Sequence, residues 1–533
     1  MPIPNRSSIV TDRPDLLVIG GGINGVSIAR DAALRGLSVV LVERDDIGSG
    51  TSSTSTKLIH GGLRYLQHRE WTLVRDALTE RGRLLGLASF LVHPLKFVLP
   101  VYRHGPHRRW FLNAGLTLYD LLARGIKLPN HRSYSSTELL DVEPALGQEG
   151  LEGGLTYHDA QVPYPERFCL ANAIDAADAG TAICNHTEVV DLIVENGSLN
   201  TIHLRHRLTG QEHWVRPRMT INAAGPWVDR VAGLLSNAPS RLIGATRGTH
   251  ILLPRKPDGP ECAIYSPARS DGRPFFVVPW RDYYWVGTTD IPQDDPDNTL
   301  PTDEEIDYLI RETIHLLPQR DFRHDDIIYA AAGLRPLPFE PGVSPAKVTR
   351  RHLLHDHRSS DRIAGLISVV GGKLTTGRQL AQEAVDEVAR RLNADLESST
   401  TSTRFLPGAG TEGPKRIGGC GLDADQVENL TQLHGDRADE LVDLIEETPE
   451  LRNRLDPQTP DIAAQVIHSV QSEWAVTIED VLLRRTGVGT GHTQGIKAAR
   501  SVGELMAVEL GWTESQEQNA VDSYLDTIKR IRR

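Results

Sequence analysis

The sequence predicts an α/β protein with an antiparallel-sheet domain and a C-terminal all-helical domain, and three patterns in its 533 residues support this fold class. A strand–turn–helix–strand unit occupies residues 15–44, near the N-terminus. Residues 275–279 and 280–287 favour two antiparallel strands. Near the C-terminus, apolar residues recur with helical spacing at Val521, Tyr524, Leu525 and Ile528.

The N-terminal unit begins with a short apolar run, residues 15–19, which is expected to form a buried parallel strand. A helix is expected over residues 23–35, and the glycine pattern G-x-G-x-x-G lies where it starts, at Gly20, Gly22 and Gly25. The first glycine permits a tight turn, and the second lets the backbone approach a pyrophosphate. The third lets the helix pack closely on the strand.

A second strand is expected over residues 38–42, and Glu43 stands at its end. A carboxylate at this point accepts hydrogen bonds from an adenosine ribose in Rossmann-like folds. Because strand, turn, helix, strand and acid all fall within about 30 residues, the unit predicts a Rossmann-like domain that binds a dinucleotide. The alternative is an ordinary βαβ crossover with incidental glycines.

Residues 49–65 form a loop that is rich in small hydrogen-bond donors, with seven serine and threonine residues, a lysine and a Gly-Gly pair. Such a loop can line the pyrophosphate and ribityl chain of a tightly held dinucleotide, with glycines where the backbone faces a flat ring. The alternative is a flexible Ser/Thr linker. The serine- and threonine-rich part of this stretch passes directly into L-I-H-G-G-L at 58–63, however, which favours a packed loop.

Several sequence blocks, in the same order along the chain, resemble the FAD-dependent glycerol-3-phosphate dehydrogenases of the D-amino-acid-oxidase-like flavoprotein group. The blocks are G-G-G-I-N-G at 20–25, T-S-S-T-S-T-K-L-I-H-G-G-L-R-Y-L at 51–66, N-A-A-G-P-W at 222–227, W-V-G-T-T-D at 285–290, G-L-R-P-L at 333–337, V-T-R at 348–350 and G-G-K-L-T-T at 371–376. Two positions and one segment depart from the family pattern. Thr56 and Ala332 stand where serine is more usual, and residues 161–168 lack the paired aspartates expected there.

The resemblance implies that FAD is the cofactor. Its contacts are then expected at Gly20, Gly22, Ile23, Asn24, Gly25, Glu43, Arg44, Thr51, Ser52, Ser53, Lys57, Leu58, His60, Gly61, Gly62, Val189, Ala224, Gly225, Gly372, Lys373, Leu374 and Thr375. The flavin does the redox chemistry in such enzymes, and the protein supplies orientation, charge and a proton acceptor. Neither a metal site nor covalent attachment of the flavin is expected.

The resemblance also implies oxidation of sn-glycerol 3-phosphate to dihydroxyacetone phosphate, with hydride transfer to FAD and electrons passed to a membrane quinone. Cations are needed to hold the phosphate, and substrate contacts are expected at Arg64, Tyr65, His250, Arg335, Arg350 and Lys373. Catalytic roles are expected for His60, Arg64 and Arg335, although a lone histidine such as His60 is often structural.

Three other functions remain open at this point. The first is a glycerol-3-phosphate oxidase, which would pass electrons to oxygen and form hydrogen peroxide. The second is a flavoprotein that oxidises an amine or a 2-hydroxy acid, for which one carboxylate-binding arginine would suffice. The third is a non-catalytic FAD-binding scaffold, which should lack an ordered set of cations around the ring.

Composition narrows the choice of partners. The formal net charge of −12 argues against a nucleic-acid partner. The four cysteines, Cys169, Cys184, Cys262 and Cys420, are far apart and offer no zinc or iron–sulfur site, which suits a reducing cytosol. No secretory signal is expected, and because no run approaches about 20 apolar residues, no membrane-spanning segment is expected either. A homodimer is possible.

A peripheral membrane contact is expected over residues 84–128, where apolar segments alternate with basic residues. Between positions 96 and 132 there are seven lysines and arginines against one acid, Asp120. Such a mixture suits a surface in the lipid headgroup region, and core helices with a solvated basic face are the alternative. The expected location is therefore the cytoplasm, at the inner face of the cell membrane.

Changes in composition suggest the domain boundaries. Residues 1–14 are expected to be a loose N-terminus, 15–395 the oxidoreductase, 396–415 a linker rich in Ser, Thr, Gly and Pro, and 416–533 a helical domain without chemistry of its own. Within the oxidoreductase, segments 15–64, 180–234 and 346–395 are assigned to FAD binding. Segments 65–179 and 235–345 are assigned to the substrate domain.

Overall fold

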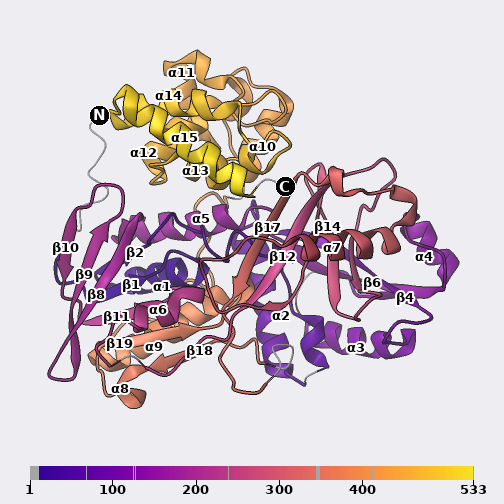
Figure 1. Ribbon diagram of the computed structural model, residues 1–533, viewed down its shortest axis with the longest axis horizontal. Coiled ribbons are helices and arrows are strands. Elements are labelled where there is room, and N and C mark those ends of the chain that lie inside the picture. Colours follow the sequence, from indigo (N-terminus) through magenta and orange to yellow (C-terminus); the bar gives the residue numbers. More distant parts are fainter. Residues whose placement is uncertain are drawn as a thin grey trace.

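The computed structural model describes residues 11–531 apart from 68, 124, 126–127, 238, 344–347 and 411. Two large sheets lie beside each other, and a layer of C-terminal helices covers them on one side (Figure 1). The fold class predicted from the sequence is confirmed. Of the expected loose segment 1–14, residues 1–10 lie outside the described residues, as do Arg124 and Lys127 of the basic segment.

A mainly parallel six-stranded sheet carries the N-terminal unit. Its strand order is β18 (Leu353–Asp356), β19 (Leu366–Val370), β11 (Met219–Asn222), β1 (Leu16–Ile19), β2 (Val39–Val42) and β7 (Ala182–Cys184). Strand β1 pairs in parallel with β11 and β2 in the middle of the sheet, and its four residues are buried. Apolar runs of this kind are typical of strands covered on both faces.

Helices cover this sheet. They are α1 (Ile23–Leu34), α5 (Pro165–Asp178), α6 (Val228–Ala232), α8 (His357–Ser360) and α9 (Gly377–Leu392). Helix α1 is almost entirely buried and packs in one apolar cluster with residues of α5 and α9. Helix α9 keeps Ala381, Ala384 and Val388 on its buried face.

A ten-stranded sheet, largely antiparallel, forms the second layer. Its main path is β16 (Ile291–Pro292), β12 (Thr246–Pro254), β15 (Tyr283–Gly287), β14 (Pro274–Trp280), β13 (Ala263–Pro267), β4 (His93–Tyr102), β6 (Leu151–Gln161) and β3 (Leu58–Ile59), while β17 (Tyr329–Arg335) pairs with β12 and β5 (Arg132–Tyr134) with β6. The strand expected over 280–287 begins only at Tyr283. Arg281 adopts a φ of 54° in the turn that separates β14 from β15.

Helices α2 (Trp71–Leu87), α3 (Arg109–Leu122), α4 (Ser136–Val142) and α7 (Asp303–Leu316) accompany this sheet. A separate three-stranded antiparallel sheet consists of β8 (Thr187–Glu195), β9 (Ser198–His206) and β10 (Glu212–Val215).

The C-terminal layer contains α10 (Ala424–His434), α11 (Glu440–Glu447), α12 (Ala463–Ser472), α13 (Ile478–Asp480), α14 (Ala498–Leu510) and α15 (Glu514–Ile531), with a π-helical turn at Val481–Arg485. Its main apolar cluster includes Val521, Tyr524 and Ile528 from the helical stripe seen in the sequence. Within the part of the chain that the structure describes, no helix is long and apolar enough to cross a membrane.

The segment 396–415 connects α9 to these helices; apart from residue 411, which lies outside the description, it has no regular secondary structure, yet part of it is packed. Thr401 is buried and its hydroxyl donates a hydrogen bond to Asp31 of α1 over 3.1 Å. Leu406 is buried in the same apolar cluster as α1 and α5. The connection is therefore partly incorporated into the core of the N-terminal layer.

Candidate active site: a nucleotide cavity that ends in a cationic pocket

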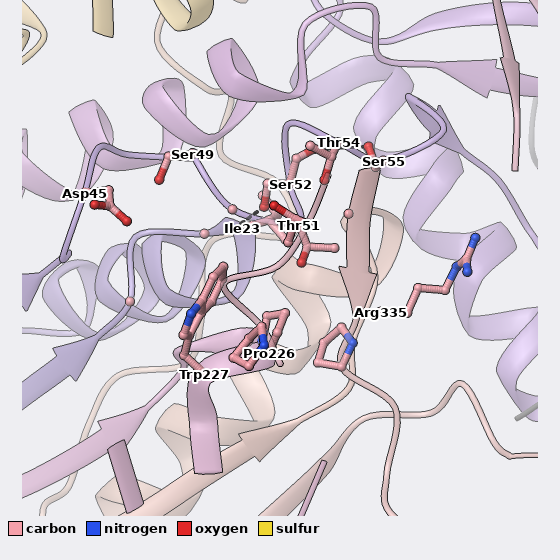
Figure 2. A pocket seen from close by; sticks show the side chains of 18 of the residues that line it. Ile23, Asp45, Ser49, Thr51, Ser52, Thr54, Ser55, Pro226, Trp227 and Arg335 are labelled. Atoms are coloured by element: carbon pink, nitrogen blue, oxygen red, sulfur yellow. Dashed lines mark hydrogen bonds between the residues drawn. The ribbon is translucent and has the colours of Figure 1, made fainter. Parts of the chain in front are cut away.

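One continuous cavity of about 1940 Å³ runs from the glycine turn after β1 to the ends of β12 and β17. Both large sheets and the C-terminal helices contribute to its wall. Figure 2 shows Asp45 and Ser49 at one side, Thr51 and Ser52 in the middle, and Arg335 at the other side. The cavity therefore joins the nucleotide-binding elements to the predicted cationic residues.

The glycine turn leaves no room for side chains at two of its positions. A Cβ atom on Gly25 would lie 1.8 Å from the carbonyl oxygen of Gly20, so α1 can pack on the turn only because this residue is glycine. Gly20 itself has a φ of 108° and abuts the backbone of Ala223. The amide of Ile23, at the N-terminus of α1, donates to Ser52 Oγ over 3.1 Å (Figure 2).

Glu43 at the end of β2 is fixed by two backbone amides. Its Oε2 accepts from Gly21 N–H over 2.6 Å and its Oε1 from Asp45 N–H over 2.8 Å. Burial raises the pKa of this carboxyl group, while the two amides oppose the rise. Glu43 lines the cavity and can accept further hydrogen bonds, as the ribose assignment requires.

The hydroxyl-rich loop is packed in place. Thr51 Oγ1 donates to the carbonyl oxygen of Leu334 over 2.6 Å, and the indole of Trp285 donates to the carbonyl of Ser55 over 3.1 Å. Thr54 lies directly against Gly333. The loop is thus attached to β15 and β17 rather than forming a free linker, and it still presents Thr51, Ser52 and Ser55 to the cavity.

Two further backbone turns border the cavity, and both contain residues that were expected to contact FAD. Ala224 and Gly225 follow β11, with Pro226 and Trp227 on the same wall (Figure 2). Gly371 and Gly372 follow β19, and a Cβ on Gly372 would lie 2.7 Å from Nδ2 of the Asn24 side chain. Two predicted segments meet here, because His60 N–H donates to Thr375 Oγ1 over 3.1 Å.

The cationic pocket collects residues from four separate segments. Arg335 at the end of β17 donates to Asp290 Oδ1 over 3.0 Å and to Thr288 Oγ1 over 2.9 Å. Arg350 lies 4.0 Å from the same carboxylate. Lys373 Nζ stands 3.8 Å from the centre of the Tyr65 ring, and Arg64 lies beside Tyr65 in a short 3-10 helix, Leu63–Leu66.

These cations are only partly neutralised. Considering the described residues alone, Lys373 Nζ and Arg350 Nη1 are buried without a hydrogen-bond partner. Burial lowers the pKa of Lys373 and of Arg335, since a desolvated cation is less stable than a hydrated one. Cations that lose water without full compensation are unfavourable, so an anionic ligand is the natural partner for this pocket.

Both predicted histidines line the cavity. Burial lowers the pKa of His60 to about 4, an effect that Lys373 strengthens and Asp159 opposes, so its ring is neutral at physiological pH. His250 stacks on Trp285, and its Nε2 lies 3.0 Å from Thr56 Oγ1. Its pKa is also well below the usual value because of burial and the nearby Arg335.

Most of the other predicted residues also line the cavity, and four do not: Gly25, Ser53, Lys57 and Gly61. The side chain of Lys57 departs most from expectation. Its ammonium group lies 3.7 Å from Glu166 and over the rings of Trp280 and Trp285, outside the cavity. Gly61 N–H donates to Asp159 instead, and Ser53 Oγ to the carbonyl of Gly50.

Sequence reasoning missed some residues of the wall. Asp290 pairs with the arginines and closes the matched block W-V-G-T-T-D, so the block itself carried a signal for it. Trp227, whose ring lies 5.0 Å from the Arg44 guanidinium, closes another block. The C-terminal lining residues, such as Thr477 and Trp512, lie in no recognisable motif.

Comparison with known proteins agrees with this geometry. Residues 15–377 match the family described as FAD dependent oxidoreductase, and residues 399–517 match the family described as the C-terminal domain of alpha-glycerophosphate oxidase. The chain is 40% identical to the glycerol-3-phosphate dehydrogenase of Synechocystis sp., over 96% of this chain and 95% of that protein. It is 34% identical to the mitochondrial glycerol-3-phosphate dehydrogenase of Homo sapiens, over 96% of this chain and 73% of that protein.

A solved structure resembles the whole chain. The glycerol-3-phosphate dehydrogenase from Bacillus halodurans, complexed with FAD, gives a TM-score of 0.80 at 28% identity and covers 99% of this chain and 96% of that chain. The glycine turn, the fixed Glu43 and the donor-rich loop fit an FAD molecule. The chain therefore belongs to the glycerol-3-phosphate dehydrogenase family of FAD-dependent oxidoreductases, and its cofactor is FAD.

Proposed function

We propose that this protein oxidises sn-glycerol 3-phosphate to dihydroxyacetone phosphate. The observation that carries the proposal is the buried cationic pocket, in which Lys373 Nζ and Arg350 Nη1 lack hydrogen-bond partners among the described residues. Bound FAD supplies the hydride acceptor for the C2 hydrogen. The relatives with the highest identity quoted above are named as dehydrogenases of the same substrate.

The charge and shape of the pocket favour a phosphate over a carboxylate. Arg335 and Arg350 offer planar forks that match phosphate oxygens, and Lys373 adds a point charge. One carboxylate, Asp290, lies within 4.0 Å of both arginines and orients them. A dianionic ligand neutralises these three cations more completely than the single carboxylate of an amino acid or a 2-hydroxy acid does.

We assign His60 as the group that accepts the proton of the C2 hydroxyl. Its ring is neutral at physiological pH, so it holds a free lone pair, and it lines the cavity beside the segment of Lys373 and Thr375. The negative charge of Asp159 favours the imidazolium that proton transfer creates. Arg64 and Arg335 hold the substrate in position, and His250 contributes to the wall near Arg335.

The electrons then pass to a membrane quinone. The dehydrogenase names of the relatives support this acceptor. The cavity is also lined by apolar and aromatic side chains that could admit a quinone ring, namely Leu63, Phe97, Tyr157, Tyr265 and Phe276. Oxygen is the second candidate, because residues 399–517 match the C-terminal domain of an oxidase.

Helix α3 is the proposed membrane contact, which would place the enzyme at the inner face of the cell membrane. Its first residues present Trp110, which is 72% exposed, and Phe111. The side chains of Arg103 and Arg108 are mostly exposed close by. Exposed aromatic residues beside arginines suit the headgroup region of an anionic bilayer.

The substrate assignment can be tested anaerobically. Glycerol 3-phosphate added to the FAD-loaded protein should bleach the flavin absorbance, whereas glycerol or lactate should not. For Arg335→Ala we expect kcat/KM to fall roughly 100-fold or more, since truncating one partner of a hydrogen-bonded charge pair costs about 3 kcal/mol. Arg323→Ala, which alters an exposed arginine paired with Asp321, is the control. Unchanged kinetics in the Arg335 variant would count against the pocket.

The pH dependence of kcat/KM should reflect the deprotonation of Lys373. Burial lowers its pKa, so raising the pH removes its proton before the usual lysine pKa of about 10.4 is reached. Loss of this cation should lower kcat/KM on the alkaline side. In Lys373→Arg that decline should vanish, because arginine stays protonated. Lys256→Arg is the control: Lys256 forms a partly exposed pair with Asp326, and this variant should retain the alkaline decline of kcat/KM. An identical decline in both variants would exclude Lys373 as its source.

The electron acceptor can be identified from the products. Under air, turnover with a short-chain quinone should form reduced quinone, with far less than one hydrogen peroxide per dihydroxyacetone phosphate. Peroxide formed one-to-one with product, in the presence or absence of quinone, would support the oxidase instead.

Flotation with liposomes of anionic phospholipid tests the membrane contact. The protein should float at low salt and less so at high salt, because screening weakens the arginine contribution. The double variant Trp110→Ser, Phe111→Ser should stay at the bottom of the gradient. Trp214→Ser, at an exposed tryptophan of β10, is the matched control and should float normally. Failure of the parent protein to float would end this proposal.

A further inference from the structure

The C-terminal helical domain forms part of the cavity wall, although the residues that it contributes lie more than 400 positions after the glycine turn in the sequence. In Figure 1, α15 and α13 lie over α5 and β17. The residues that it contributes include Thr477, Asp480, Arg484, Trp512, Asn519 and Tyr524. They share the cavity with Asp45, His186 and Arg207, which surround the end of β2 where Glu43 stands.

A fully buried ion cluster attaches this domain to the loop after Glu43. Arg485 donates to both oxygens of Asp46, over 2.5 and 2.8 Å, and Arg484 Nε donates to Oδ2 over 2.6 Å. The side chains of Asp46 and Arg485 are both 0% exposed. Two neighbouring residues of a regular α-helix point in different directions, and the π-helical turn Val481–Arg485 allows both arginines to reach one carboxylate.

A second attachment reaches the chain segment beside β2. His186 N–H donates to the carbonyl oxygen of Asp45 over 2.7 Å, and its Nε2 lies 3.0 Å from Asp480 Oδ2. Asn185 Nδ2 donates to the carbonyl of Trp474 over 2.7 Å. Residues 45–46 and 185–186, which flank the predicted adenosine site, are therefore both tied to residues 474–485.

The tied loop is the one that orients Glu43. The carboxylate of Glu43 is held by the amides of Gly21 and Asp45, and Gly48 N–H donates to the carbonyl of Gly21 over 3.0 Å. Moving Asp46 would therefore shift the amide that fixes Glu43 Oε1 and the contact of the loop with the glycine turn. Precise placement of such a carboxylate determines how well it receives a ribose.

We infer that the C-terminal helical domain retains the cofactor by clamping the adenosine half of FAD. Arg484 and Arg485 are positioning residues that act through Asp46 on Glu43, and residues 477–480 and 512–524 close the cavity on that side. The inference concerns FAD binding and is independent of the substrate assigned above. It also gives the C-terminal domain a role that its lack of motifs did not indicate.

FAD affinity of the apoprotein is the direct test, measured by quenching of FAD fluorescence on titration. Arg485→Met should raise the Kd for FAD at least tenfold, and Arg485→Lys should restore part of the affinity because it keeps a cation beside Asp46. Arg416→Met is the matched control, since Arg416 pairs with Asp443 and Glu446 on the exposed side of the same domain. A Kd for Arg485→Met within twofold of the parent would overturn the inference, even if the variant melts at a lower temperature.

Hydrogen exchange on the unmodified protein keeps the inference testable if the Arg485 variants do not fold. FAD, and equally ADP alone, should slow amide exchange several-fold in residues 476–486 and 512–524 relative to the apoprotein. FMN, which lacks the adenosine half, should leave these segments unchanged, and helices α10 and α11 serve as an internal reference. Protection by FMN and not by ADP, or no protection by FAD, would contradict the clamp.

Discussion

Positive charge that neighbouring acids neutralise only in part is the constraint on which the site depends. Arg335, Arg350 and Lys373 are partly withdrawn from water, Asp290 neutralises the first two only in part, and Glu70 acts on Lys373. Removing a cation from water is expensive unless an anion or several acceptors replace the solvent. The free protein therefore carries an unfavourable arrangement that a bound anion relieves, and the gain is largest for a ligand with two negative charges.

Such an arrangement persists only if the surrounding fold prevents the cations from turning outward. Arg335 stands at the end of β17 and is tied to Asp290 and Thr288, while Lys373 follows β19 and rests on the Tyr65 ring. The two sheets thus both contribute cations to one pocket. Groups fixed before the ligand arrives need no reorganisation when charge develops during reaction, which is the main electrostatic advantage of an enzyme site.

The sequence predicted the parts of this site that rest on local geometry or on family motifs. The glycine turn and Glu43 follow from the length of one βαβ unit, and the cations from blocks such as G-G-K-L-T-T. It could not predict where long side chains turn. Lys57 sits within a matched block, yet Glu166 and two tryptophans draw its ammonium group away from the cavity. The C-terminal wall depends on tertiary contacts between distant segments, which no local pattern encodes.

The buried ion cluster of Asp46, Arg484 and Arg485 is not explained by its contribution to stability alone. Replacing a buried ion pair with apolar side chains is often neutral or stabilising, whereas removing one partner costs roughly 3–5 kcal/mol. An apolar contact would therefore join the two domains as firmly. Three charged groups with fixed hydrogen-bond directions do something that an apolar contact cannot, because they specify one orientation of the loop between Glu43 and Gly48. That specificity matters only where a neighbouring group must be placed accurately, and the nearest such group is the carboxylate of Glu43.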